Sequence, residues 1–319
     1  MEKSILLVSI RDFPVKGRGA EGAGGAGEAE GAEGEKGEKG EILNSQFPIL
    51  NSQFPIPNSQ FPILNSQFPI PNSQMCMSQF PNKIQTIQVT AHRGSSMNAP
   101  ENTMSAINLA IQDQADYIEI DVQQTKDGKL VVLHDSNLQG VAGVDENIWE
   151  LDYEEVRKLD VGSWFDSKFA EERVPCLEEV IKAVKGKIKL NIELKLNGHE
   201  QELAVEVVKL VDEHKFLKQC VISSADYHTL LKVKELNPEI ATGLIMTTAI
   251  EHVDQFKVDF YSVQPLVATI DFVNQAHANG REVHVWTINE LKEMETFLNR
   301  QVDNIITDTP KTLRGLLPK

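Results

Sequence analysis

The chain has 319 residues, enough for one large domain or two ordinary ones, and its hydrophobic fraction of 41% is typical of a globular protein. The formal net charge is −16 at pH 7, which argues against a general nucleic-acid binder, because such a protein presents a basic surface. Three cysteines, Cys76, Cys176 and Cys220, are too few and too scattered for a disulfide framework or a zinc knuckle.

The first 82 residues are predicted to form a disordered tail. From Gly17 to Glu41 the sequence is almost entirely Gly, Ala, Glu and Lys, and such a segment cannot bury enough apolar surface to fold. A seven-residue repeat follows from Asn44, and the proline in its full units forbids a continuous helix. We interpret the repeat as an unfolded spacer from repeated DNA. The alternatives are a Phe-rich docking tail, or a true start at Met75 or Met77.

The N-terminal residues carry no recognisable targeting signal. The apolar run 4–10 is short, lacks a basic lead-in and is followed by no small-residue cleavage site. No run approaches the roughly 20 apolar residues that a membrane span requires. We therefore expect a cytoplasmic protein without stable membrane insertion.

From about Lys83 to Lys319, strand and helix signals alternate along the chain. The strands are predicted at 87–91, 117–122, 130–133, 188–194, 220–223, 242–245, 260–263, 282–287 and 304–307. The helices are predicted at 103–112, 177–184, 200–214, 227–236, 270–278, 291–298 and 309–316.

This alternation predicts a (β/α)8 TIM barrel over residues 83–319, with an open doubly wound sheet as the alternative. The barrel is favoured because no Gly-x-Gly-x-x-Gly motif follows the first strand. Residues from about 137 to 175, after the hairpin of the second and third strands, have little periodicity and include Trp149, Trp164 and Phe165. They are predicted to form an insertion over the barrel mouth.

Polar residues gather at the ends of the early strands. Asp127-Gly128 predicts a two-residue hairpin turn. Pairing Lys126 with Lys129 across it would place Asp121 opposite His134, with Glu119 on the same face as Asp121. His92 ends the first strand, where barrel enzymes carry their catalytic groups, so it is expected to join this cluster.

A third carboxylate, Glu193, ends a later apolar strand. Oxygen-only ligation by Glu119, Asp121 and Glu193 suits one hard divalent cation, Mg²⁺ or Ca²⁺, rather than zinc. Arg93 and Lys195 are the cations assigned to an anionic phosphate oxygen. The pattern predicts a metal-assisted phosphodiesterase site.

The order of these motifs resembles the glycerophosphodiester phosphodiesterase family over residues 86–317. The resemblance rests on His92-Arg93-Gly94, Pro100-Glu101-Asn102-Thr103, Glu119-Ile120-Asp121, Asp127-Gly128, His134-Asp135, Glu193-Leu194-Lys195 and Trp286-Thr287. It implies a barrel enzyme that hydrolyses a small glycerophosphodiester to sn-glycerol 3-phosphate and an alcohol in lipid metabolism. It also implies general acid and base roles for His92 and His134, metal ligation by the three carboxylates, and phosphate contacts from Arg93 and Lys195.

The chain departs from the family at Gly140-Val141-Ala142-Gly143, where members often carry Arg-x-Thr-Gly, and this bears on alcohol preference. Two other functions remain open. One is a lysophospholipase D, which would need a wide apolar groove beside the same site. The other is a catalytically silent phosphate-binding module with an interaction tail, which the intact histidines and carboxylates disfavour.

Five residues outside the main constellation have competing interpretations. Glu101 is expected to face the site, while Asn102 or Thr103 caps the following helix. Trp286 lines the barrel mouth or packs inside the barrel. Asp308 is interpreted as a cap for the last helix rather than a catalytic group.

Overall fold

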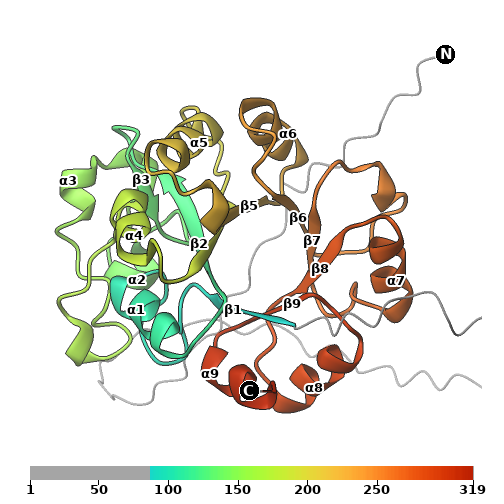
Figure 1. Ribbon diagram of the computed structural model, residues 1–319. Coiled ribbons are helices and arrows are strands. Elements are labelled where there is room, and N and C mark those ends of the chain that lie inside the picture. The colour runs from blue at the N-terminus through green and yellow to red at the C-terminus, as the bar shows by residue number, and fades with distance from the viewer. Residues whose placement is uncertain (1–86, 319) are drawn as a thin grey trace, which may run out of the picture. The chain divides into compact units, whose positions relative to one another are not determined.

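The structure is a computed structural model that describes residues 87–318 (Figure 1). The predictions for residues 1–82 and for the domain boundary at residue 83 lie outside this range. The strands are β1 Gln88–His92, β2 Tyr117–Gln124, β3 Leu130–Val132, β4 Lys189–Leu194, β5 Cys220–Ser224, β6 Thr242–Met246, β7 Phe260–Val263, β8 Glu282–Val285 and β9 Asn304–Thr307.

Eight parallel strands close into a barrel, which confirms the predicted fold and excludes the open sheet. Around the barrel the order is β1, β2, β4, β5, β6, β7, β8 and β9, and β9 pairs again with β1. The register places His92 beside Glu119 and Asp121 beside Glu193. Residues from β1, β2 and β4 are therefore neighbours at the carboxyl end of the barrel, where the loops after the strands meet.

Helices surround the strands in Figure 1, which looks into the barrel. The α-helices are α1 Met104–Gln112, α2 Gln139–Ala142, α3 Tyr153–Val156, α4 Leu177–Val184, α5 Leu203–Glu213, α6 Tyr227–Leu236, α7 Ile270–Ala278, α8 Leu291–Asn299 and α9 Pro310–Leu316. Short 3-10 turns are η1 Ile148–Glu150, η2 Ser167–Phe169, η3 Leu217–Gln219 and η4 Val253–Gln255. None of the helices in residues 87–318 is both long and apolar enough to cross a membrane.

Alternation along β2 separates the core from the site. Ile118, Ile120 and Val122 are fully buried in the main hydrophobic core between strands and helices. Glu119 and Asp121 lie between them and point to the opposite face, into the barrel. The apolar residues of one strand thus stabilise the barrel while the alternate residues supply polar groups to its interior.

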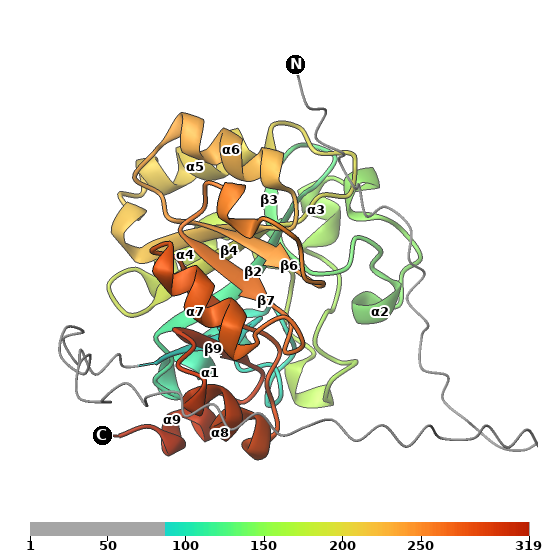
Figure 2. The same cartoon turned by 90° about the vertical axis from the view of Figure 1, so that its right-hand side faces the viewer.

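The segment between β3 and α4 forms the predicted insertion. It contains α2, η1, α3 and η2, and Figure 2 shows α2 and α3 to one side of the barrel. The insertion has a small hydrophobic core of its own, which packs against β3 and consists of Val131, Leu133, Leu138, Ile148, Val156, Val161 and Val174.

The predicted hairpin register is wrong by one residue. The observed pairs include Val122 with Val132, and the Leu133 amide donates to the Asp121 carbonyl at 2.9 Å, so Asp121 faces Leu133 rather than His134. The turn has three residues instead of two, because Thr125 pairs with Lys129 and Gly128 adopts a left-handed φ of 79°. His134 lies beyond the end of β3, so the hairpin register does not decide where its side chain points.

Candidate active site

Three carboxylates converge at the carboxyl ends of β2 and β4. One carboxylate oxygen from each of Glu119, Asp121 and Glu193 lies within 4.8 Å of the other two. Glu119 and Asp121 retain only 4% and 1% of their exposure. The sequence predicted this trio, and the structure brings its members together.

The carboxylates of the trio repel one another in a buried setting. Burial and the charges of Asp121 and Glu193 raise the pKa of Glu119 well above its ordinary value. Burial, with repulsion from Asp121, also raises the pKa of Glu193. Burial alone would raise the pKa of Asp121, but Lys195 and Arg93 hold it below its ordinary value.

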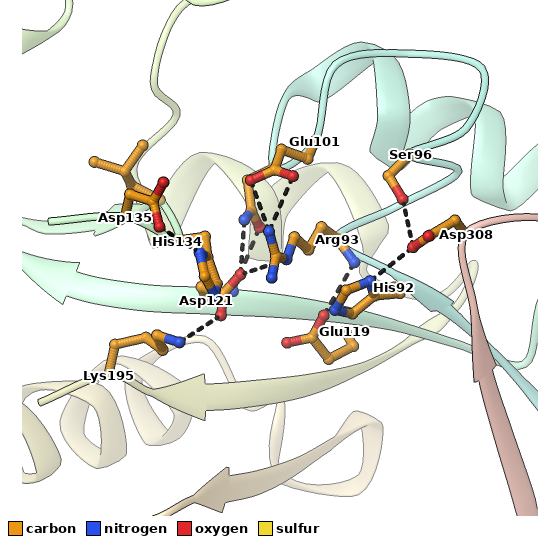
Figure 3. A network of polar contacts seen from close by, with 12 residues as sticks. His92, Arg93, Ser96, Glu101, Glu119, Asp121, His134, Asp135, Lys195 and Asp308 are labelled. Carbon is orange, nitrogen blue, oxygen red and sulfur yellow. Dashed lines mark hydrogen bonds and ion pairs between the residues drawn. The ribbon is translucent and has the colours of Figure 1, made fainter. Parts of the chain in front are cut away.

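Arg93 lies among these acids on a left-handed turn with φ of 55° (Figure 3). Its backbone amide donates to Glu119 Oε2 at 3.0 Å. Its Nη1 donates to both carboxylate oxygens of Glu101 at 2.9 Å, and its Nε lies 3.4 Å from Asp121 Oδ2. Glu101 therefore lies beside the carboxylate trio, and its position anchors the guanidinium.

Lys195 approaches the trio from the end of β4. Its Nζ lies 3.3 Å from Glu193 Oε1 and 3.7 Å from Asp121 Oδ1. Burial would lower the pKa of Lys195, but Glu193 and Asp121 raise it above the ordinary value. The ammonium therefore stays charged inside the barrel mouth.

His92 and Asp308 form a pair that the sequence did not predict. His92 Nδ1 lies 2.7 Å from Asp308 Oδ1, which also accepts from Ser96 Oγ at 3.0 Å. Asn289 Nδ2 donates to the other oxygen of Asp308 at 2.6 Å. Asp308 is therefore not the cap of α9, whose N-cap residue is Thr309. The sequence Thr307-Asp308-Thr309-Pro310 permits Asp308 either to cap α9 or to bind His92. Asp308 binds His92 because β9 pairs with β1 and brings the two residues together.

His134 lies beside Asp121 in Figure 3, on the side away from His92. Its Nδ1 lies 2.8 Å from Asp135 Oδ1, and its carbonyl accepts from Gln123 Nε2 at 3.0 Å. Burial, with Arg93 and Lys195 nearby, lowers the pKa of His134, although Asp121 opposes this. The imidazole is thus biased toward its neutral form.

Asn102 is a second site residue whose role the sequence did not predict. Its Nδ2 donates to Asp121 Oδ2 at 2.8 Å, and its Oδ1 accepts from the Asp121 amide at 3.3 Å. Its backbone has a left-handed φ of 57°, which Asn tolerates better than most residues. Helix capping falls to Thr103, whose Oγ1 accepts from the Ala106 amide. Asn102 directly precedes the helix cap Thr103, and nothing in this local sequence indicated its hydrogen bonds to Asp121.

Trp286 follows β8 at the mouth end of the barrel, and its backbone amide donates to Val263 at 3.0 Å. Its indole Nε1 is buried and has no hydrogen-bond partner among residues 87–318. Deeper in the barrel, His284 stacks on Phe260 with ring centroids 4.2 Å apart. His284 therefore packs, whereas the contact of Trp286 with a substrate stays a prediction.

The charges of the site are suited to a divalent cation. Glu101, Glu119, Asp121 and Glu193 bring four carboxylates, while Arg93 and Lys195 bring two cations. A divalent cation at the trio would balance this excess and remove the repulsion between the buried acids. The all-oxygen donor set is the one that Mg²⁺ and Ca²⁺ prefer.

Comparison with known proteins gives a consistent result. The model of the glycerophosphoryl diester phosphodiesterase family matches residues 92–312. A glycerophosphodiester phosphodiesterase of Caldanaerobacter subterraneus is 36% identical over 242 residues, which cover 72% of this chain and 98% of that protein. A lysophospholipase D of Homo sapiens is 27% identical over 271 residues, which cover 71% of this chain and 85% of that protein.

A solved structure of an Oleispira antarctica phosphodiesterase, in complex with the product sn-glycerol-3-phosphate, has a TM-score of 0.69 and 30% identity. The match covers 72% of this chain and 96% of that one. The closed barrel, the polar groups at its mouth and these matches together place the chain among the phosphodiesterases. The chain belongs to the glycerophosphoryl diester phosphodiesterase family, and it is an enzyme of that family.

Proposed function

We propose that this enzyme hydrolyses glycerophosphodiesters to sn-glycerol 3-phosphate and an alcohol, and that it depends on a divalent cation. The observation that carries the proposal is the convergence of Glu119, Asp121 and Glu193. His92 lies beside Glu119 and His134 beside Asp121 in Figure 3. The similar Oleispira enzyme, whose structure contains sn-glycerol-3-phosphate as product, supports the substrate class.

Glu119, Asp121 and Glu193 would hold the cation, either Mg²⁺ or Ca²⁺. When bound, it neutralises charge on the phosphodiester and so favours attack at phosphorus. Arg93 and Lys195 bind further phosphate oxygens from the rim of the trio. Because Glu101 and Asp121 fix the guanidinium, Arg93 offers its donors to the phosphate without a large loss of side-chain entropy.

The histidines divide the proton transfers. His134 is biased toward the neutral form, so it takes the proton from the attacking oxygen. His92 donates a proton to the leaving alcohol. In each ring Nδ1 is bound by a carboxylate, Asp135 or Asp308, so Nε2 is the atom that exchanges the proton.

A lysophospholipase D activity is the second candidate, because the human relative of that name is similar over most of the described residues. The catalytic groups would be the same, and only the alcohol side of the substrate would differ. The silent-module alternative is not favoured, since His92, His134 and all three carboxylates are present. A cytoplasmic location and a role in lipid metabolism stay predictions from the sequence.

The test is to incubate the full chain and its variants with glycerophosphocholine and Mg²⁺ or Ca²⁺, and to measure sn-glycerol 3-phosphate and choline. We expect the wild type to release both in equal amounts. His134→Ala should lower the rate about 10²- to 10⁴-fold. His228→Ala, an exposed histidine of α6, should leave it unchanged. Equal rates in wild type and His134→Ala would refute the proposed role.

A further inference from the structure

Large apolar side chains are exposed around the carboxyl end of the barrel. They lie in the loops after β1, β4, β6 and β7 or at the first residues of α7 and α8, and all of these positions meet at that end. We name this set the mouth rim, and it consists of Met97, Leu196, Ile250, Leu266, Ile270 and Leu291.

The exposure of the mouth rim is large for side chains of this kind. Leu266 is 89% exposed and Ile270 is 61% exposed. Single exposed leucines are normal on a protein surface. A group of them around an active site is different, because water-exposed apolar groups gathered at one functional surface mark an interaction site.

Parts of the loops that carry most of the mouth rim lack charge, although the exposed acids Glu251, Asp271 and Glu290 directly follow three of the uncharged segments. Segments 95–100, 247–250, 264–270 and 286–289 contain no Asp, Glu, Lys or Arg, in a chain where 24% of residues are charged. At the opposite end of the barrel, the segments before β4, β5, β7 and β9 carry acidic and basic residues, for example at 185–189, 212–219, 254–259 and 299–303.

The partner that fits this surface is a lipid layer with an apolar interior and headgroups of no net charge. A chain with a net charge of −16 is repelled by an anionic membrane. The uncharged segment 264–270, which carries Leu266 and Ile270, can enter a zwitterionic lipid surface without stripping water from charged groups. The loops of the mouth rim surround the trio of carboxylates, so the active site would face the lipid.

We propose that the mouth rim docks the enzyme on a zwitterionic lipid surface. The docking itself does not depend on catalysis. Its consequence for substrate choice rests on the proposed function, because a docked enzyme would reach glycerophosphodiesters that carry an acyl chain and reside in the lipid. Soluble diesters would enter the same site without docking.

The test is flotation of the full chain with phosphatidylcholine vesicles, with a matched pair of double variants. Leu266→Glu/Ile270→Glu places two charges in the mouth rim. Leu236→Glu/Leu316→Glu places the same charges at the ends of α6 and α9, where the leucines are 39% and 37% exposed. Both variants should hydrolyse glycerophosphocholine at the wild-type rate, which shows that fold and site are intact.

We expect the wild type and the control variant to float with the vesicles. The mouth-rim variant should lose at least about tenfold in partitioning, as expected for two apolar side chains that no longer enter the lipid. Added salt should not weaken the wild-type interaction, whereas anionic lipid should weaken it. These results together would support the proposal.

Three results would overturn it. The wild type does not float, or the two double variants lose binding equally, or sedimentation shows a dimer that only the mouth-rim variant loses. The last result would assign the surface to a second copy of the chain. Failure of all forms to hydrolyse any diester, with the flotation pattern intact, would refute the proposed function and leave the docking surface in place.

Discussion

His92 Nδ1 lies 2.7 Å from Asp308 Oδ1, although the two residues are 216 positions apart in the sequence. β9 pairs with β1 and so brings the last βα loop against the first. We predict that Asp308→Asn lowers kcat about 10- to 10³-fold, because the imidazole loses the group that fixes its tautomer and orientation.

Steady-state kinetics with glycerophosphocholine would measure this effect. The change should fall on kcat with KM nearly constant, since Asp308 positions His92 rather than binding substrate. Asp254→Asn, an exposed residue of η4, serves as the control. A pure increase in KM, or no change at all, would show that Asp308 does not position His92.

The lowered pKa of His134 predicts the pH dependence of the reaction. Because burial and the neighbouring cations disfavour its protonated form, the acidic limb of kcat/KM should lie below the ordinary value of about 6.5. The unfolded chain binds the proton first as pH falls, so this histidine also makes the free energy of unfolding decrease toward acid pH. NMR titration of the imidazole, with His134→Ala to assign the signal, measures the value directly. A value above 6.5 would contradict the predicted direction of the shift.

We expect Glu119 to destabilise the metal-free enzyme at neutral pH. The pKa of this carboxyl is raised in the folded state, so the unfolded chain releases the proton first. The contribution of Glu119 therefore lowers the free energy of unfolding as pH rises above about 4.5, the ordinary value. In EDTA, Glu119→Gln should unfold at a higher temperature than the wild type at pH 7, and a divalent cation should stabilise the wild type but not the variant.

Thermal unfolding in EDTA, followed by circular dichroism from pH 4.5 to 7.5, would test this prediction. Glu154→Gln, an exposed residue of α3, controls for the loss of one charge. If the difference in unfolding temperature between the wild type and Glu119→Gln does not change across that range, Glu119 does not destabilise the metal-free protein in the predicted way.

Gly94 is predicted to be essential for the fold of the β1 loop. Its φ is 87°, and a Cβ placed there would lie 2.6 Å from the backbone of Ala106 in α1. Gly94→Ala should therefore cost about 2 to 5 kcal/mol of stability. Gly128→Ala has a similar φ of 79° but open space around it, so it should cost only about 1 to 2 kcal/mol. Chemical denaturation compares the two, and equal costs would mean that α1 shifts to admit the methyl group.

The sequence predicted the barrel well because its parallel strands are short apolar runs separated by amphipathic helices. α4, for example, buries Leu177, Val180, Ile181 and Val184, and this spacing marks one helix face. The carboxylate trio was also predictable, because alternation along β2 and β4 fixes which residues face the barrel interior.

Other features depended on contacts that no local pattern encodes. The hairpin register failed because Thr125 and a left-handed Gly128 favour a three-residue turn over a two-residue one. Asp308 and Asn102 were interpreted as caps because their local sequences fit capping. Their partners, His92 and Asp121, become neighbours only when the barrel closes.

We predict that Glu119, Asp121 and Glu193 bind the divalent cation on which phosphodiester hydrolysis depends. The most direct measurement is the rate of sn-glycerol 3-phosphate release from glycerophosphocholine by EDTA-treated enzyme during titration with Mg²⁺ or Ca²⁺. We predict no release before the titration, saturable recovery in the wild type, and at least about 10²-fold weaker recovery in Glu193→Gln. Full activity in EDTA, or identical titration curves for the wild type and Glu193→Gln, would contradict the account.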